Sequence, residues 1–186
     1  MSRISIVDPR TAHGEARRLL DAVQARLGAA PNFIRLLANS PKALEGFLGL
    51  HGALGGAALD KATQERIALA VAEGNGCRYC VSAHTAIGRH AGLSDDEMLR
   101  NRAGTSSDAK AAGAVAFARA VNEHVGDVTA AELAAARAAG LSDAEIVEVI
   151  AVVALNVFTN LLGKASQVEI DFPPVGLLGD AVQAAA

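Results

Sequence analysis

Aromatic residues are scarce in this chain of 186 residues, which contains no tryptophan, one tyrosine and five phenylalanines. Hydrophobic residues nevertheless make up 51% of the sequence, and most of them are alanine, leucine and valine. Alanine loses no side-chain entropy in a helix and lets backbones approach closely, so this composition favours tightly packed helices. It also leaves more apolar surface than a small monomer can hide, and we therefore expect a homo-oligomer.

An excess of basic residues is absent as well. The chain has 17 Lys and Arg against 20 Asp and Glu, which gives a net charge of −3. We therefore expect no binding to nucleic acid or to an anionic membrane, which would need an excess of positive charge. Charged residues within the first ten positions interrupt any signal-peptide pattern. The most apolar segment, residues 146–162, is broken by Glu148, Asn156 and Asn160, so we expect no membrane span.

Cysteine is limited to two residues, both in the run Cys77-Arg78-Tyr79-Cys80. In a chain without an export signal, such a pair indicates a reducing, cytoplasmic setting, where CxxC is redox-active or metal-binding more often than structural. Because the whole sulfur content of the chain lies in one cluster, we interpret this cluster as a dithiol enzyme site.

Alternating strand patterns are missing, and every periodic segment indicates a helix. Helix start signals recur along the chain: Ser40-Pro41, Asp60, and three predicted capping boxes that begin at Ser94, Thr129 and Ser142. We predict helices at residues 15–27, 41–54, 61–74, 77–90, 108–124 and 143–166, with an irregular tail after them. The length suits one all-α domain over residues 1–186.

The geometry of the cysteine cluster suggests its chemistry. On a helix, His84 lies one turn after Cys80, and Cys77 lies one turn before it. The thiolate is the reactive form of cysteine, and a base or a helix N-terminus within one turn promotes its formation. One thiol can therefore be oxidised by peroxide and condense with the other to a disulfide. Spacing alone leaves the order of attack open, although the neighbouring His84 favours Cys80.

Two other interpretations of the cluster remain. A structural zinc site needs four protein ligands, and the chain offers only Cys77, Cys80 and His84 in register, without a second cluster. The two cysteines could also simply pack at the end of a helix. The all-helical pattern excludes a thioredoxin fold, which requires βαβ units.

The string Glu65-x11-Cys77-x2-Cys80-x3-His84, followed by Gly92-Leu93-Ser94, resembles the AhpD-like alkylhydroperoxidase branch of the carboxymuconolactone decarboxylase superfamily. The resemblance covers about residues 30–170, and the cysteine motif is its specific part. The other similar segments are residues 31–33, 40–41 and 140–160.

The resemblance implies an AhpD-like helical bundle, trimeric or hexameric, that acts as a thiol peroxidase without metal or haem. It also implies that Cys80 attacks the peroxide, that Cys77 resolves the intermediate, and that His84 and Glu65 relay protons. The reductant would be an external dithiol, of the lipoyl type in some systems, or its carrier protein. Well-studied members have histidine where this chain has Tyr79, which removes one possible proton carrier.

Two competing functions follow from the same pattern. A lyase acting on a carboxylated lactone would need a base and an anion pocket but no paired thiols. A helical oligomer whose CxxC only senses redox state would form the disulfide reversibly with negligible peroxide turnover. Residues without a partner motif are taken as surface or packing residues: His13, His51, His90 and His124.

Overall fold

The computed structural model describes residues 2–183, with side chains up to residue 180, and this part of the chain is helical without strands. The predicted all-α, AhpD-like fold is confirmed. The helices are α1 Gly14–Leu27, α2 Asn32–Leu37, α3 Pro41–Leu54, α4 Lys61–Gly74, α5 Arg78–His90, α6 Asp95–Arg102, α7 Ala109–Glu123, α8 Ala130–Ala138, α9 Asp143–Ser166 and α10 Leu178–Gln183.

The helix termini follow the local signals in the sequence. Ser40 and Asp60 accept hydrogen bonds from the backbone N–H groups three residues later, which satisfies donors that a helix leaves free. Complete capping boxes form at Thr129 and Ser142. The capping box predicted at Ser94 is wrong in its second half, because the Glu97 side chain turns into the protein interior instead of returning to Ser94.

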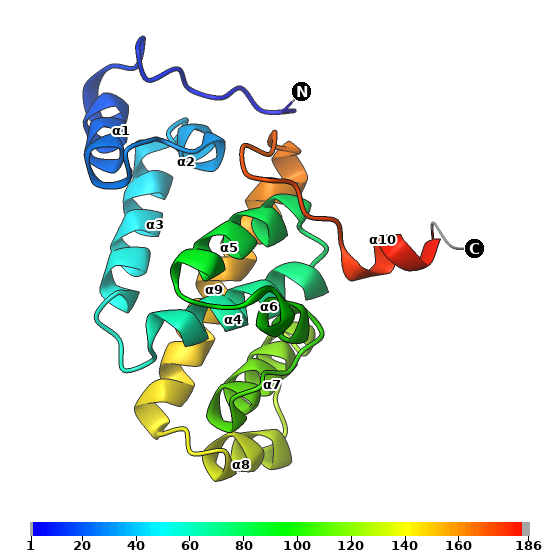
Figure 1. Cartoon of the computed structure of the whole chain (residues 1–186). Helices are drawn as coiled ribbons and strands as arrows, with labels where there is room; N and C mark the ends of the chain where they lie inside the picture. Colours follow the sequence, from blue (N-terminus) through cyan, green and yellow to red (C-terminus); the bar gives the residue numbers. More distant parts are fainter. Residues whose placement is uncertain (1, 184–186) are drawn as a thin grey trace.

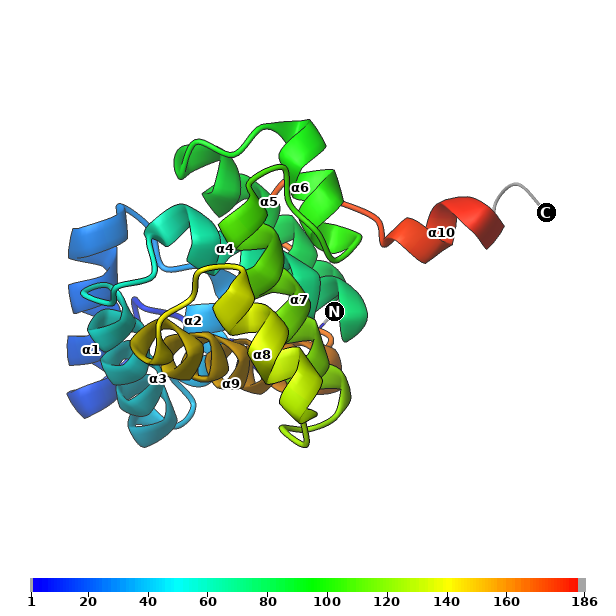
Figure 2. The ribbon, with the colours of Figure 1, turned by 90° about the horizontal axis from the view of Figure 1, so that it is seen from below.

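Helix α4 is central to the arrangement and packs against α5, α6, α7 and α9 (Figures 1 and 2). One apolar cluster joins α1, α2 and α3 to the cysteine-bearing helix α5. A second joins α4, α7, α8 and α9. Helices α4 and α5 contribute to the region where these two clusters meet, and they carry the predicted site.

Two segments differ from the sequence expectations. The short helix α2 was not predicted, because six residues are too few to show a clear helical period. The tail is irregular up to residue 177 as predicted, but α10 then forms and extends away from the body (Figure 1). The irregular part lies across α5: Ser82 Oγ accepts a hydrogen bond from Val175 N at 2.9 Å, and Arg102 donates to Gly176 O.

Helix α9 is long and apolar enough by composition to cross a membrane, with a mean hydropathy of 2.0 over its most apolar window. One side of it packs against α4 and α7, and 44% of that window is buried.

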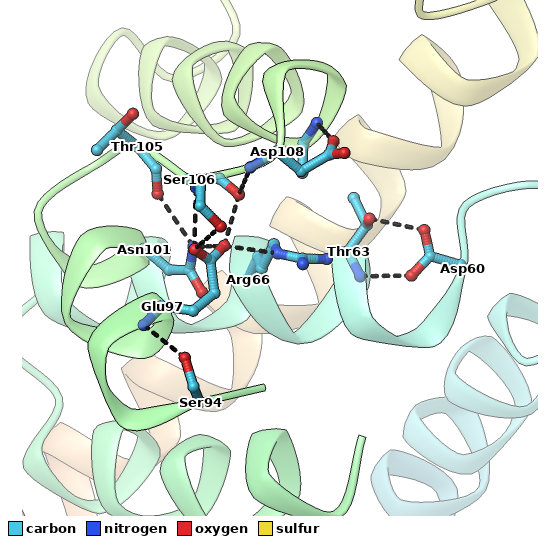
Figure 3. Close-up of polar contacts among 11 residues, drawn as sticks. Asp60, Thr63, Arg66, Ser94, Glu97, Asn101, Thr105, Ser106 and Asp108 are labelled. Carbon is cyan, nitrogen blue, oxygen red and sulfur yellow. Dashed lines mark hydrogen bonds and ion pairs between the residues drawn. The ribbon is translucent and has the colours of Figure 1, made fainter. Parts of the chain in front are cut away.

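A buried carboxylate joins α4 to α6 and to the loop before α7 (Figure 3). Glu97 is 7% exposed and accepts hydrogen bonds from Arg66 Nε at 2.9 Å, Asn101 Nδ2 at 3.0 Å, and the Ser106 and Ser107 hydroxyl groups. Burial alone would raise the pKa of Glu97, but these hydrogen bonds outweigh it and hold the pKa well below its ordinary value of 4.5. Glu97 therefore stays ionised and holds three segments together.

Replacing this carboxylate tests its contribution to stability. We expect Glu97→Gln to lower the free energy of unfolding at pH 7 by about 3 kcal/mol, because the partly buried Arg66 loses its charged partner. A lowered pKa in the folded state stabilises the fold above about pH 4.5 and loses that effect as pH falls, so the difference between variant and wild type should shrink in acid.

Denaturant unfolding between pH 3 and pH 8 measures this effect. Glu123→Gln is the matched control, because Glu123 pairs with Arg119 on the surface and its loss should cost no more than about 0.5 kcal/mol. Equal losses of unfolding free energy in the two variants at pH 7 would show that the buried Glu97 network stabilises the fold no more than a surface ion pair does.

Candidate active site

A tight turn delivers the cysteines to the start of α5. Asn75 caps the end of α4, and its side chain donates to Asn122 Oδ1 and Asn160 Oδ1 at 3.0 and 2.9 Å. Gly76 follows with φ of 64°, a left-handed conformation that glycine adopts without strain. Cys77 then serves as the N-cap of α5, and its Sγ accepts a hydrogen bond from Cys80 N at 3.3 Å. The turn thus places both sulfurs at a helix N-terminus.

The two cysteines are joined by a disulfide and are almost inaccessible, with Cys77 2% and Cys80 3% exposed. Helix α9 closes one side of the pair at Gly163. A Cβ atom at Gly163 would lie 3.2 Å from Cys77 Sγ and 3.7 Å from Cys80 Sγ. The absence of a side chain at this position therefore makes room for the sulfurs.

Glu65 on α4 and His84 on α5 form a pair, as the family resemblance implied. Glu65 Oε2 lies 2.8 Å from His84 Nδ1, and the two side chains are 12% and 20% exposed. The bond to Nδ1 orients the imidazole and leaves Nε2 free for a second partner. Both side chains are therefore more exposed than the two sulfurs.

Tyr79, which lies between the two cysteines in the sequence, connects neighbouring segments through its hydroxyl group. Its hydroxyl donates to Asp171 Oδ1 at 2.8 Å and accepts from Phe33 N at 3.2 Å, which ties α5 to both the tail and α2. Burial and then the bond to Asp171 raise the pKa of Tyr79 well above its ordinary value of 10. The hydroxyl remains protonated and does not serve as a proton carrier at neutral pH.

His51 was treated as a surface or packing residue, yet it lies within electrostatic range of the site. Its ring stacks on Phe47 with the centroids 5.7 Å apart. Burial lowers the pKa of His51, while the charge of Glu65 acts in the opposite direction and that of His84 in the same direction. No motif links His51 to the site in the sequence, because the charges of Glu65 and His84 act on it from other helices.

The structure thus pairs Glu65 with His84 and Cys77 with Cys80, and His84 follows Cys80 by one turn of α5. On α9, Asn160 accepts a hydrogen bond from Asn75 at the end of α4, whereas Asn156 bonds to Val152 O within α9. Within the described residues, no group of three or more His, Cys, Asp or Glu side chains is arranged to hold a metal ion.

The close contact at Gly163 leads to a stability prediction. We expect Gly163→Val to lower the free energy of unfolding by about 1 to 3 kcal/mol, because the added carbons must enter space that the sulfurs occupy. Gly46→Ala is the control, since a Cβ there meets nothing within 4 Å and alanine should stabilise α3 by up to about 1 kcal/mol. Thermal unfolding of both variants measures this, and a stabilising Gly163→Val would contradict the packing described.

Comparison with known proteins agrees with this arrangement. Residues 41–123, which include Glu65, both cysteines and His84, match the sequence model of the carboxymuconolactone decarboxylase family. These residues, less than half of the chain, are thus similar to this family, and the chain as a whole shares its fold with AhpD-like structures. No curated protein matches the sequence.

Several solved structures share the fold over nearly the whole chain. A peroxidase-related protein with an AhpD core from Ralstonia eutropha JMP134 has 24% identity and a TM-score of 0.81, covering 91% of this chain and 92% of its own. A peroxidase-related protein from Silicibacter sp. TM1040 has 22% identity and a TM-score of 0.78, with coverages of 94% and 92%. The debrominase Bmp8, in complex with 2,3,4-tribromopyrrole, has 19% identity and a TM-score of 0.76, with coverages of 90% and 91%.

Proposed function

We propose that the protein is a thiol peroxidase that reduces hydroperoxides through the Cys77–Cys80 pair. The observation that carries this proposal is the disulfide at the N-terminus of α5, one helical turn from a histidine that a partly buried carboxylate orients at 2.8 Å. A CxxC pair that can close and reopen stores two electrons, which is the number that reduction of a peroxide O–O bond requires.

In the first step, the reduced Cys80 attacks the terminal oxygen of the hydroperoxide. His84 accepts the Cys80 proton, directly or through one water, and returns it to the departing alkoxide. Sulfur is oxidised to a sulfenic acid, and the O–O bond is reduced to an alcohol. Glu65 keeps the imidazole oriented through this transfer.

In the second step, Cys77 attacks the Cys80 sulfur and water leaves, which produces the disulfide. The helix N-terminus supports this step, because its free N–H groups and dipole favour a thiolate at Cys77. An external dithiol, of the lipoyl type or presented by a carrier protein, then exchanges with the disulfide and returns both thiols. We also propose that the protein is located in the cytoplasm and forms a homo-oligomer, either a trimer or a hexamer.

The burial of the sulfurs adds a preference for substrate size. Both cysteines are at most 3% exposed, and α9 closes one side of the pair at Gly163. This favours small hydroperoxides over bulky ones.

Peroxide turnover with dihydrolipoamide as reductant tests the proposal. The wild type should consume peroxide catalytically, and the Cys77→Ser/Cys80→Ser double variant should not. Reversible disulfide formation without turnover under any dithiol would instead indicate a redox-sensing oligomer.

A lyase function, which the name of the matching family indicates, is the alternative. Decarboxylation of a carboxylated lactone uses a base and an anion pocket but no disulfide. The double cysteine variant separates the two functions, because it should keep lactone decarboxylation if the protein is a lyase and lose peroxide reduction if it is a peroxidase.

The fold shared with a debrominase suggests one further electron acceptor for the same dithiol. Two thiols could convert a carbon–bromine bond to carbon–hydrogen, with formation of the disulfide and release of HBr. Bromide release from 2,3,4-tribromopyrrole by the reduced protein, faster than peroxide consumption, would favour this reaction over the peroxidase.

A further inference from the structure

Asn160 on α9 carries a buried hydrogen-bond donor that has no acceptor. The residue is 1% exposed, and its Oδ1 accepts a hydrogen bond from Asn75 Nδ2 at 2.9 Å. Its own Nδ2 is buried as well and has no hydrogen-bond partner among the residues that the structure describes. A buried donor without an acceptor destabilises a fold, so such a group calls for a physical explanation.

The surroundings of Asn160 place this donor beside the start of the cysteine motif. Its partner Asn75 lies two residues before Cys77 in the turn that leads into α5. Lys164, four residues after Asn160, donates to the Asn75 carbonyl oxygen. At Gly163, three residues after Asn160, a Cβ atom would lie 3.2 Å from Cys77 Sγ. Because Cβ positions three residues apart on a helix are about 5 to 6 Å from one another, the Asn160 carboxamide and the Cys77 sulfur occupy neighbouring space.

Reduction of the disulfide creates an acceptor in this space. In the disulfide, Cys77 Sγ is bonded to Cys80 Sγ and carries no charge. When that bond is broken, the two sulfurs must move apart from bonding distance. A thiolate at Cys77 is then an anion with almost no access to water, since the residue is 2% exposed, and it needs hydrogen-bond donors from the protein.

We propose that Asn160 Nδ2 donates a hydrogen bond to the Cys77 thiolate in the reduced protein and so stabilises the thiolate form. The two cysteines thus have separate partners, His84 for Cys80 and Asn160 for Cys77. A larger thiolate fraction at Cys77 speeds its attack on the Cys80 sulfenic acid, and this consequence rests on the proposed peroxidase function. The hydrogen bond itself does not, because every reduced form of the pair contains the Cys77 thiol.

The charged groups on the helices and the tail that pack against α5 also act on this thiol, but they have partners of their own. These partners are Glu73 with Arg102, Arg78 with Asp180, Arg89 with Asp95, His84 with Glu65, Asp171 with the Tyr79 hydroxyl, and Lys164 with the Asn75 carbonyl. None of these contacts involves the Asn160 side chain. A change in Cys77 ionisation on replacing Asn160 therefore reports the loss of its carboxamide.

Titration of a single thiol tests the proposal. In a Cys80→Ser background, the ultraviolet absorbance of the thiolate from acid to alkaline pH gives the pKa of Cys77 without a reagent that must reach the buried sulfur. We expect Asn160→Leu, which removes the donor and keeps a similar volume, to lower the acid dissociation constant of Cys77 about tenfold. Asn160→Asp, which when ionised keeps an acceptor for Asn75 but has no donor, should lower it at least as much.

Asn122→Leu is the matched control. Asn122 exchanges two hydrogen bonds with Asn75, each of 3.0 Å, whereas Asn160 makes one. Its loss therefore disturbs the turn before Cys77 at least as much, but removes no unpartnered buried donor. We expect its Cys77 titration to match the wild type, with circular dichroism establishing that all variants are folded. An unchanged titration in Asn160→Leu, as a water molecule on Nδ2 would produce, overturns the proposal, and so does an equal change in Asn122→Leu.

The consequence for the second reaction step is measured separately, with both cysteines present. In Asn160→Leu, closure of the disulfide after the Cys80 sulfenic acid forms should slow by up to about tenfold at pH 7. This deficit should vanish at a pH where Cys77 is fully ionised in both proteins, and a deficit that is equal at every pH would contradict the proposed role. A wild type that forms no sulfenic acid would contradict the peroxidase function, while the titration would still decide whether the hydrogen bond exists.

Discussion

Cys80→Ser should abolish peroxide reduction, with a loss of at least about a thousandfold in rate, because a serine hydroxyl cannot replace the thiolate nucleophile. The position of Cys80 supports this role, since it lies on α5 one turn before His84. Peroxide consumption by the pre-reduced variant measures the effect. The fold should persist in this variant, because the substitution changes one atom.

The companion variant Cys77→Ser separates the two cysteine roles. It should consume one equivalent of peroxide and then stop at the Cys80 sulfenic acid, which dimedone labels and mass spectrometry detects. Full turnover by Cys80→Ser, or a sulfenic acid that forms on Cys77 in that variant, would reverse the assigned roles.

His84→Ala should slow the reaction with peroxide by about 10²- to 10⁴-fold, the usual range for the loss of a general acid–base catalyst. Glu65→Gln should have a smaller effect in the same direction, because the imidazole stays in place but loses its charged partner at 2.8 Å. Single-turnover kinetics of the reduced variants with peroxide measure both effects.

His90→Ala provides the control for this experiment. His90 lies on the same helix, but its Nδ1 bonds to Ala86 O and its side chain is exposed, so its loss should leave the rate unchanged. If His84→Ala and His90→Ala reacted equally fast, the proton relay would have to be abandoned.

The parts of the fold that depend on local chemistry could be predicted from the sequence. Start signals such as Ser40, Asp60 and Ser142 define helix termini through bonds to residues three positions away, so they can be recognised without the fold. The grouping of Cys77, Cys80 and His84 is likewise set within one helix. Glu65 came from the resemblance to a family, since a residue on another helix has no local signal.

The rest depends on contacts between distant segments. Gly163 lies 83 residues after Cys80 in the chain but directly against its sulfur, and nothing in the sequence around it indicates that role. The same holds for Asp171, which accepts a hydrogen bond from the Tyr79 hydroxyl. For Glu97 the local pattern was misleading. It predicted a capping box, but in the folded chain the carboxylate accepts hydrogen bonds from Arg66 and Ser106 instead.

The most direct test of the proposed function is stopped-flow peroxide consumption by the pre-reduced wild-type protein, with thiols counted before and after. We predict that both thiols disappear, with one peroxide consumed per disulfide formed, at a rate far above that of free cysteine. A rate equal to that of free cysteine would contradict the proposal, because the environment of Cys80 would then provide no activation.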